Sequence, residues 1–376
     1  MFETKVTSYE MKKINRSKVY QYIYSNHHSS RPEISYALQM SFPTVTQNLT
    51  ALEDCGLITK NGFSESTGGR KAQRVSCNPT AKIAIGVELL KESVLIAAVD
   101  LYGTVLKDSS VDLPFSNSPD YFQRVCNQIN NFIATLSFPV SQILGIGIAM
   151  QGLVSEDGQT MIYGKILQCT GLKIDNFSQY LDLPCIFIHD AKASASAELW
   201  FLKDVSNAIY LSLNRNLGGA VILNGEVQSE NGSISGTFEH ICINPSGDLC
   251  YCGKRGCLET YCSAYSLCNA SGESIDRFFE LLGQKDSRIQ GIWENYLRYL
   301  AIAITNIRHV MDYDFIIGGL LSTYFREEDY QYLSALLEEN SSIQIKTLRL
   351  IPGKCGKQVT AIGAALHYIV PFLKSI

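Results

Sequence analysis

The feature that most restricts the fold of this chain is a long alternation of two hydrophobic patterns, which begins near residue 79. Short apolar and β-branched runs, such as KIAIGVELL, ILGIGIAMQGLV and DFIIGGLL, are typical of buried strands. Between them lie segments with helical character, including SPDYFQRVCNQINNFIATL and GIWENYLRYLAIAITNIRHVM. Strands that alternate with helices form α/β layers. Residues 79–376 are therefore expected to form an α/β body, in which no internal sequence repeat is visible.

Residues 1–78 show a different pattern, in which helical spacing occurs three times. The third segment places Val45, Leu49 and Leu52 on one face, and Ser41 precedes it as a helix cap. Two short alternating runs, LITK and QRVSC, then flank a polar, glycine-rich tip. We expect a winged helix-turn-helix, in which three helices carry a small β wing.

The charge of the chain is divided between these two regions. The net charge of −4 is made up of +4 in residues 1–75, with ten Lys and Arg against six Asp and Glu, and −8 in the rest, with 22 against 30. A basic head on an acidic body suggests that the head meets a polyanion. Polar side chains near the start of the third helix suit the major groove, and basic ones at the wing tip suit a narrow minor groove. The predicted DNA-binding residues are Thr44, Thr46, Gln47, Asn48, Arg70 and Lys71.

A cluster of soft metal ligands lies within HICINPSGDLCYCGKRGCLE, residues 240–259. Three thiols share one loop, whose glycines permit a tight backbone, and a histidine completes the set. The predicted ligands are His240, Cys250, Cys252 and Cys257. A Cys3His set is typical of a structural, tetrahedral zinc site, because the protein fills all four positions. Cys242 and Cys262 are alternative ligands, which we interpret instead as buried thiols.

Several of these motifs together make the chain similar to the ROK family of bacterial repressors and sugar kinases. The resemblance runs nearly end to end and includes STGGRKA, GIGIAMQGLV, HDAKASASAELWF, CYCGKRGCLETY and AIGAAL, of which the cysteine motif is the most specific. The helix-turn-helix head places the chain with the repressor branch, like the xylose and N-acetylglucosamine repressors. The resemblance implies two actin-like, ribonuclease-H-like lobes around a cleft. The first is residues 79–189, the second is residues 190–358 with the zinc loop, and a C-terminal helix at 359–376 packs back on the first.

The resemblance also implies a sugar pocket in the cleft, where this chain departs from the family. Asp190 matches the general base of the kinases, and Glu259 matches a sugar-binding carboxylate. His189 stands where the family has Asn, and Thr237 replaces a pocket carboxylate in the segment that keeps His240. A site that loses a hydrogen-bonding partner loses affinity for the hydroxyl group it served. These five residues are the expected ligand contacts, for an atypical sugar or for none.

Two basic positions point to one kind of atypical ligand. His189 and Lys192 both replace asparagines of the family pattern. An acidic sugar or a sugar phosphate would explain both changes.

The two glycine turns that hold ATP phosphates in the family kinases are degraded here. The first has become GVELLKESV, with Glu88 followed by bulky or charged residues, and the second has become NRNLG, in which only Gly218 remains. Backbone amides reach a phosphate only where such side chains are absent. Phosphoryl transfer depends on that positioning. We therefore expect no kinase activity.

The sequence favours a DNA-binding transcriptional regulator of carbohydrate genes, most simply a repressor that a sugar-like inducer releases. Its expected partners are a double-stranded operator, the inducer and a second copy of the chain, as a homodimer or a dimer of dimers. One alternative is a zinc-stabilised DNA-binding regulator that a protein partner controls without a small-molecule inducer. Another is a sugar kinase with a fused head.

The expected location is the cytoplasm. No apolar run approaches the ~18–20 residues that span a bilayer. The segment MFETKVTSYEMKKINRSK has no apolar core of the kind found in a secretory signal. Twelve cysteines in a chain of this kind indicate thiols and metal rather than disulfides.

Overall fold

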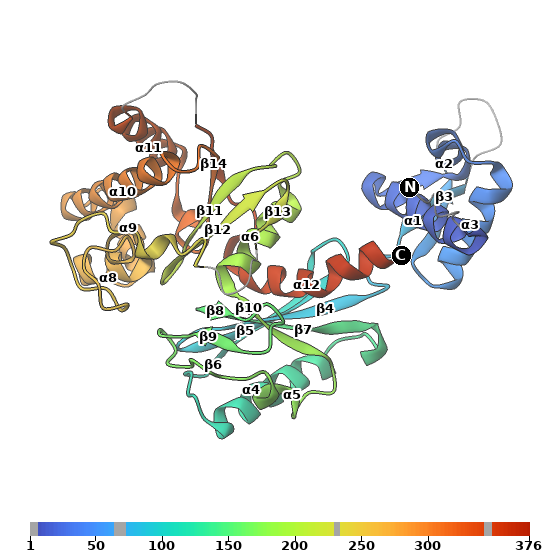
Figure 1. Cartoon of the computed structure of the whole chain (residues 1–376), viewed down its shortest axis with the longest axis horizontal. Coiled ribbons are helices and arrows are strands. Elements are labelled where there is room, and N and C mark those ends of the chain that lie inside the picture. Colours follow the sequence, from blue (N-terminus) through green and yellow to red (C-terminus); the bar gives the residue numbers. More distant parts are fainter. Residues whose placement is uncertain (1–6, 64–72, 229–233, 342–347) are drawn as a thin grey trace, which may run out of the picture.

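The computed structural model describes residues 7–63, 73–228, 234–341 and 348–376. Figure 1 shows an N-terminal head beside two α/β lobes, with a long helix running between the lobes toward the head. Within the described ranges, no helix combines the length and the apolarity needed to cross a membrane.

The head, as far as it is described, contains three helices and a three-stranded antiparallel sheet. Its elements are α1 (Ser8–Asn26), β1 (His28–Ser30), α2 (Arg31–Leu38), α3 (Phe42–Asp54), β2 (Ile58–Phe63) and β3 (Gln73–Cys77). Strand β3 lies between β1 and β2. The Oγ of Ser41 accepts the Thr44 N–H at 3.3 Å and so caps α3. This is the element order of a winged helix-turn-helix; the predicted wing-tip residues Arg70 and Lys71 lie outside the described residues.

The first lobe contains a mixed sheet in the order β10-β7-β4-β5-β6. Its strands are β4 (Ile83–Leu89), β5 (Ser93–Asp100), β6 (Val105–Asp112), β7 (Ile143–Met150) and β10 (Cys185–His189). The helices α4 (Pro119–Ala134) and α5 (Asp175–Ser178) and a hairpin of β8 (Leu153–Val154) and β9 (Met161–Tyr163) belong to the same lobe. Apolar side chains of α4 and of the sheet form the main core of this lobe.

The second lobe contains a mixed sheet in the order β13-β12-β11-β14-β15. Its strands are β11 (Ala208–Leu213), β12 (Leu217–Leu223), β13 (Glu226–Val227), β14 (Asp314–Gly318) and β15 (Leu350–Pro352). Its helices are α7 (Glu259–Cys262), α8 (Ala264–Ser271), α9 (Ile275–Gly283), α10 (Ser287–Arg308) and α11 (Glu327–Asn340). Helix α10 supplies many of the buried side chains in the core of this lobe.

The two sheets share one topology, as expected for two ribonuclease-H-like lobes. In each, the first strand of the lobe is central, with the second and third strands antiparallel on one side and the fourth and fifth parallel on the other. The chain therefore contains a structural repeat without a visible sequence repeat. Different residues can form the same sheet when strand-like and helical segments alternate in the same way.

Two helices, α6 (Asp190–Phe201) and α12 (Val359–Ser375), pack against each other between the lobes (Figure 1). Glycines let their backbones meet closely. A Cβ on Gly363 of α12 would lie 1.7 Å from the carbonyl oxygen of Ala193 in α6, and one on Gly86 of β4 would lie 1.8 Å from that of Ala361. Helix α12 thus rests directly on the sheet of the first lobe and on α6.

The head is joined to the body by the end of α12 and by Tyr102 of the first lobe, which α6 supports. Ile376, which follows α12, is 7% exposed within the head core, and Phe372 packs against the same cluster. Tyr24 of α1 stacks on Tyr102 with ring centroids 4.4 Å apart. Trp200 of α6 donates its indole N–H to the Tyr102 carbonyl at 2.8 Å. The head core is therefore completed by residues of the body.

Candidate ligand cavity and metal cluster

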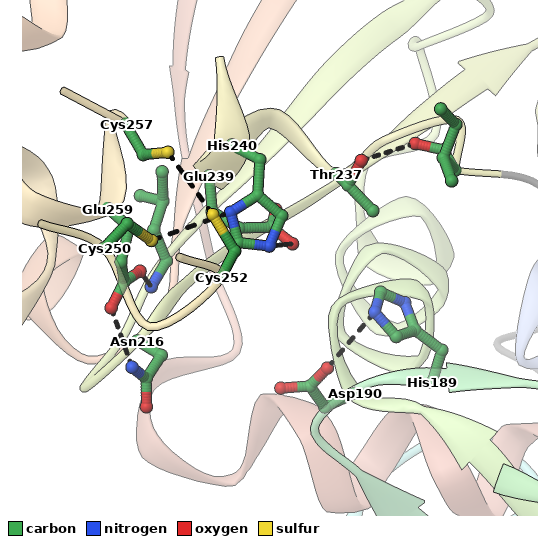
Figure 2. A network of polar contacts seen from close by, with 12 residues as sticks. His189, Asp190, Asn216, Thr237, Glu239, His240, Cys250, Cys252, Cys257 and Glu259 are labelled. Atoms are coloured by element: carbon green, nitrogen blue, oxygen red, sulfur yellow. Dashed lines mark hydrogen bonds and ion pairs between the residues drawn. The ribbon is translucent and has the colours of Figure 1, made fainter. Parts of the chain in front are cut away.

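The four predicted metal ligands meet at one point of the second lobe (Figure 2). The ligand atoms of His240, Cys250, Cys252 and Cys257 all lie within 4.8 Å of one another. The Sγ atoms of Cys252 and Cys257 are 3.7 Å apart, and Cys250 Sγ is 3.8 Å from His240 Nδ1. Metal–ligand bonds of about 2.0–2.3 Å in a tetrahedron give separations of this size. The cluster therefore fits a tetrahedral divalent metal.

The loop that holds the thiols requires glycine at one position above all. Gly256 has a φ of +72°, and a Cβ there would lie 1.6 Å from the Asn244 carbonyl oxygen. Bridges between Cys242 and Cys257 and between Leu249 and Arg255 close the loop. This turn holds Cys257 in position through the backbone alone.

The two alternative thiols lie apart from the cluster. Cys262 is buried, as expected, and its Sγ lies 3.7 Å from the Tyr296 carbonyl oxygen. The expectation that Cys242 is also buried is wrong: its side chain is exposed, and its Sγ lies 3.6 Å from the Arg255 carbonyl oxygen. Cys242 is the bridge partner of Cys257, and its side chain faces solvent while its neighbours Ile241 and Ile243 pack on the core of the lobe.

A cavity of about 500 Å³ lies between the lobes, next to the metal cluster. Residues of both lobes line it. The polar lining residues are Gln151, Lys165, His189, Asp190, Asn216, Thr237, Glu239 and His240, and the larger apolar and aromatic ones are Leu153, Ile162, Tyr163, Ile166, Leu217, Ile234 and Tyr251. Four of the five predicted ligand contacts line this cavity, and Glu259 does not.

Asp190 begins α6 at the floor of the cavity, and His189 precedes it at the end of β10. His189 Nε2 lies 3.6 Å from an Asp190 carboxylate oxygen, and its Nδ1 has no partner among the described residues. Burial raises the pKa of Asp190 to about 7 and lowers the pKa of His189 to about 3. The imidazole is therefore neutral at pH 7, and Asp190 is poised to exchange a proton or accept a ligand hydroxyl.

Glu239 is a cavity residue that the sequence reasoning missed. Its carboxylate is buried and lies beside His240, with Oε1 3.9 Å from His240 Nε2 (Figure 2). The other oxygen, Oε2, has no hydrogen-bond partner within the described part of the chain. The family resemblance implies only the loss of a carboxylate at Thr237. The structure supplies another two residues later, and its position directly before a predicted metal ligand was the available signal.

Glu259 is turned away from the cavity by its own hydrogen bonds. It accepts the Leu217 N–H at 2.6 Å and the Asn216 side-chain N–H at 2.7 Å, so both of its oxygens are occupied (Figure 2). Asn216 in turn reaches Gln151 of the first lobe, with 3.4 Å between Gln151 Nε2 and Asn216 Oδ1. The expected direct ligand contact by Glu259 is therefore not seen, and its carboxylate instead orients the cavity residue Asn216.

Thr237 lines the cavity, but its hydroxyl serves the protein. It donates to the carbonyl oxygen of Ile234 at 2.6 Å, and the Thr237 N–H reaches the same oxygen at 3.1 Å. Lys192 does not line this cavity at all; it lines a neighbouring one of about 380 Å³ on the other side of His189. Neither of the two basic positions singled out from the sequence therefore offers a cation to this cavity, but the cationic side chain of Lys165 does line it.

The first altered glycine turn follows the buried carboxyl group of Glu88, and the second is held by hydrogen bonds within the second lobe. Burial and the nearby Asp190 raise the pKa of Glu88 to about 7. In the second turn, the Asn214 side chain accepts the Leu320 N–H at 2.7 Å and donates to Ser212 Oγ at 3.0 Å. The Asn214 carbonyl accepts the Ala264 N–H at 2.9 Å. Polar groups of this turn thus bond to the second lobe itself.

On the head, the exposed start of α3 combines predicted residues with two that were missed. Thr46 and Gln47 are exposed and Thr44 is half-buried, but the expected exposure of Asn48 is wrong. Asn48 is buried and donates to the Thr44 carbonyl at 2.9 Å. The missed residues are Arg31 at the start of α2 and Phe42 at the start of α3. The Arg31 guanidinium lies 5.4 Å from the Phe42 ring centroid and donates to Thr46 Oγ1 at 3.2 Å.

Taken together, a helix-turn-helix head, two lobes of one topology and a polar cavity beside a Cys3His cluster define a class of two-lobed sugar-kinase-like proteins with an added head. The ROK family model matches residues 84–369, and the chain belongs to the ROK family.

Similar proteins agree with this membership. The xylose repressor of Bacillus spizizenii is 27% identical, over 96% of this chain and 97% of its own length. The N-acetylglucosamine repressor of Escherichia coli O157:H7 is 29% identical, over 66% of this chain and 62% of its own length. A crystallised ROK family transcriptional regulator, a homologue of the E. coli MLC protein, has a TM-score of 0.74 at 26% identity and covers 97% of both chains. A ROK family glucokinase from Streptomyces griseus has a TM-score of 0.67 at 19% identity and covers 76% of this chain and 98% of its own.

Proposed function

We propose that this protein is a DNA-binding transcriptional repressor of carbohydrate genes, released by a sugar-like ligand in the interlobe cavity. The observation that carries the proposal is the continuous connection from the cavity to the head. Helix α6 begins with Asp190 in the cavity, and near its other end Trp200 holds Tyr102, on which Tyr24 of the head stacks. The end-to-end similarity to a xylose repressor supports the same conclusion.

The head is proposed to bind an inverted-repeat operator as part of a dimer, because one helix-turn-helix covers few base pairs. Gln47 and Thr46 on α3 face solvent where a major groove would lie, and Arg31 adds a cation beside them. A gel-shift titration of the full chain on its own promoter region tests this. Gln47→Ala should weaken specific binding by roughly 10- to 100-fold. Gln331→Ala, the same change on exposed α11 of the second lobe, is the control and should bind normally.

Ligand binding is proposed to act by changing how the two lobes close. A ligand that contacts Asp190 and the second lobe favours one closure state, so the population of that state rises when the ligand binds. Because Trp200 and Tyr102 connect α6 to the head, closure re-aims α3. Trp200→Phe removes the 2.8 Å hydrogen bond and keeps an aromatic ring. That variant should bind operator and ligand separately but lose most of the ligand-dependent release; full release would contradict the connection.

The Cys3His cluster is proposed to hold structural zinc, since four protein ligands leave no position for activated water. His240 and Glu239 both line the cavity, so the metal would fix one wall of it. Kinase activity is proposed to be absent because the altered turns offer no free glycine amides to a phosphate. A coupled assay with ATP and a sugar that binds should show no phosphorylated product above background.

A further inference from the structure

The interlobe cavity is divided into a polar floor and an aliphatic mouth. The floor is formed by Asp190 and by Glu239, beside the metal cluster. The mouth carries apolar side chains from both lobes: Leu153, Ile162 and Ile166 from the first, with Tyr163 and Lys165 beside them, and Ile234 from the second. A hydroxyl-rich sugar alone satisfies the floor but leaves the mouth without an apolar partner.

Two of these mouth residues are strongly exposed for their type. Ile162 on β9 is 44% exposed, and Ile234 is 75% exposed. Single exposed apolar side chains are ordinary on protein surfaces. Here they belong to different lobes and line the same cavity, so one apolar group placed there would contact both.

Hydrogen bonds to its own carbonyl oxygen hold Ile234 in position. Its carbonyl oxygen accepts both the backbone N–H and the hydroxyl of Thr237, at 3.1 and 2.6 Å. These two hydrogen bonds close a tight turn that holds Ile234 at the cavity. Thr237 therefore contributes to the mouth through Ile234, and it does so with the hydroxyl that it would otherwise offer to a ligand.

We infer that the ligand of this cavity is amphipathic: a carbohydrate that carries an apolar substituent, such as an aryl or alkyl glycoside. This inference rests on the proposed function, since it specifies the ligand of the same site. The sugar hydroxyls bond to Asp190 and Glu239, while the substituent packs between Ile162 and Ile234. Burying the substituent excludes water from both side chains and draws the lobes together.

Calorimetric titrations with matched glycosides test the inference on the full-length protein. The probes are phenyl and methyl β-glycosides of glucose, xylose and N-acetylglucosamine, each compared with its free sugar. In the sugar series that binds, the phenyl glycoside should bind at least tenfold more tightly than the methyl glycoside. It should also show a more negative heat-capacity change, the marker of apolar burial. Equal affinities would overturn the inference alone; failure of all nine probes would overturn the sugar-sensing function with it.

Variants locate the effect. Ile162→Ser and Ile234→Ser should each lower phenyl-glycoside affinity about tenfold and leave methyl-glycoside affinity nearly unchanged. Val310→Ser, at an apolar residue that is 81% exposed outside the cavity, is the control. Thr237→Val should behave like Ile234→Ser, whereas Thr237→Ser keeps the hydroxyl bond and should retain the preference. Equal loss for methyl and phenyl glycosides would contradict the division into floor and mouth.

Discussion

The two lobes have the same strand order but use it differently. In the first lobe, the turn after the central strand β4 is tight, with the Leu90 N–H bonded to the Ser93 carbonyl, and it contributes nothing to the cavity lining among the described residues. In the second, the turn after the central strand β11 delivers Asn216 to the cavity. One topology thus supplies a scaffold twice, and the turns decide which copy carries chemistry.

Insertions at different points of the shared strand order widen this difference. The first lobe adds the hairpin β8–β9, which presents aliphatic Ile162. The second adds the segment that carries Glu239 and the Cys3His cluster. A nearly symmetric fold therefore encloses an asymmetric cavity, which has the metal cluster on the side of the second lobe. Function lives in such grafted segments rather than in the shared sheet.

The largest expected effect breaks the second lobe alone. Cys257→Ser should reduce the metal content of the protein from one ion per chain to nearly none and destabilise this lobe by several kcal/mol, because metal binding is coupled to folding. Cys242→Ser, an exposed thiol outside the cluster, is the matched control and should keep the metal. Elemental analysis and thermal unfolding measure both. Metal-free wild-type protein, purified without chelator, would contradict the site.

The next effect concerns the helix pair that both lobes share. Gly363→Ala should destabilise the protein by at least about 1–3 kcal/mol, since the added methyl group would meet the Ala193 carbonyl at 1.7 Å. Gly291→Ala, in helix α10 where the described structure leaves open space, should instead stabilise by up to about 1 kcal/mol. Denaturant titrations give both values. If Gly363→Ala stabilised the protein and Gly291→Ala destabilised it, α12 and α6 would not be in close contact.

The third effect depends on pH and belongs to the cavity floor. The pKa of Asp190 is raised to about 7 from 3.8, so its contribution to stability is full below about pH 4 and is lost as pH rises through 7. The loss is up to about 4 kcal/mol. Asp190→Asn should therefore raise the unfolding temperature at pH 8 more than at pH 4.5, while weakening ligand binding.

A control of opposite character accompanies that pH test. Asp157 is exposed, and the Ser155 hydroxyl and the Gln159 N–H lower its pKa. Asp157→Asn should give no stabilisation at pH 8. The same gain in both variants would show that burial of Asp190 is not the cause.

The smallest effect tests the bridge between the lobes. Gln151→Ala removes the contact of 3.4 Å with Asn216 and should cost about 0.5–1.5 kcal/mol of stability. The free energy of ligand binding should become less favourable by a similar amount, because the bridge orients Asn216. Gln179→Ala, an exposed residue of the first lobe, is the comparison. A change in unfolding without any change in ligand affinity would place the bridge outside the site.

Local patterns predicted local structure well. The Ser41 cap and the spacing of Val45 and Leu49 are sufficient to place α3, because helix termini and amphipathic faces depend on neighbours in sequence. The Cys3His cluster was similarly visible, since three of its ligands share one short loop. The exposure of Asn48 was mispredicted because its amide bonds back to Thr44, a local alternative to facing solvent.

Long-range contacts were not predictable in the same way. The orientation of Glu259 depends on Asn216, which is far away in the chain, and a family match at one position does not fix a partner at another. The burial of Ile376 in the head core is likewise a property of assembled elements. Pairings across such sequence distances are set by tertiary packing.

The completion of the head core by Phe372 and Ile376 has a consequence for synthesis on the ribosome. The head is translated first, yet these side chains follow about 300 residues later, roughly 15–60 s at 5–20 residues per second. During that interval the nascent head lacks part of its apolar core. The apolar core of the head is therefore complete only after both lobes have been made, although the head itself is translated first.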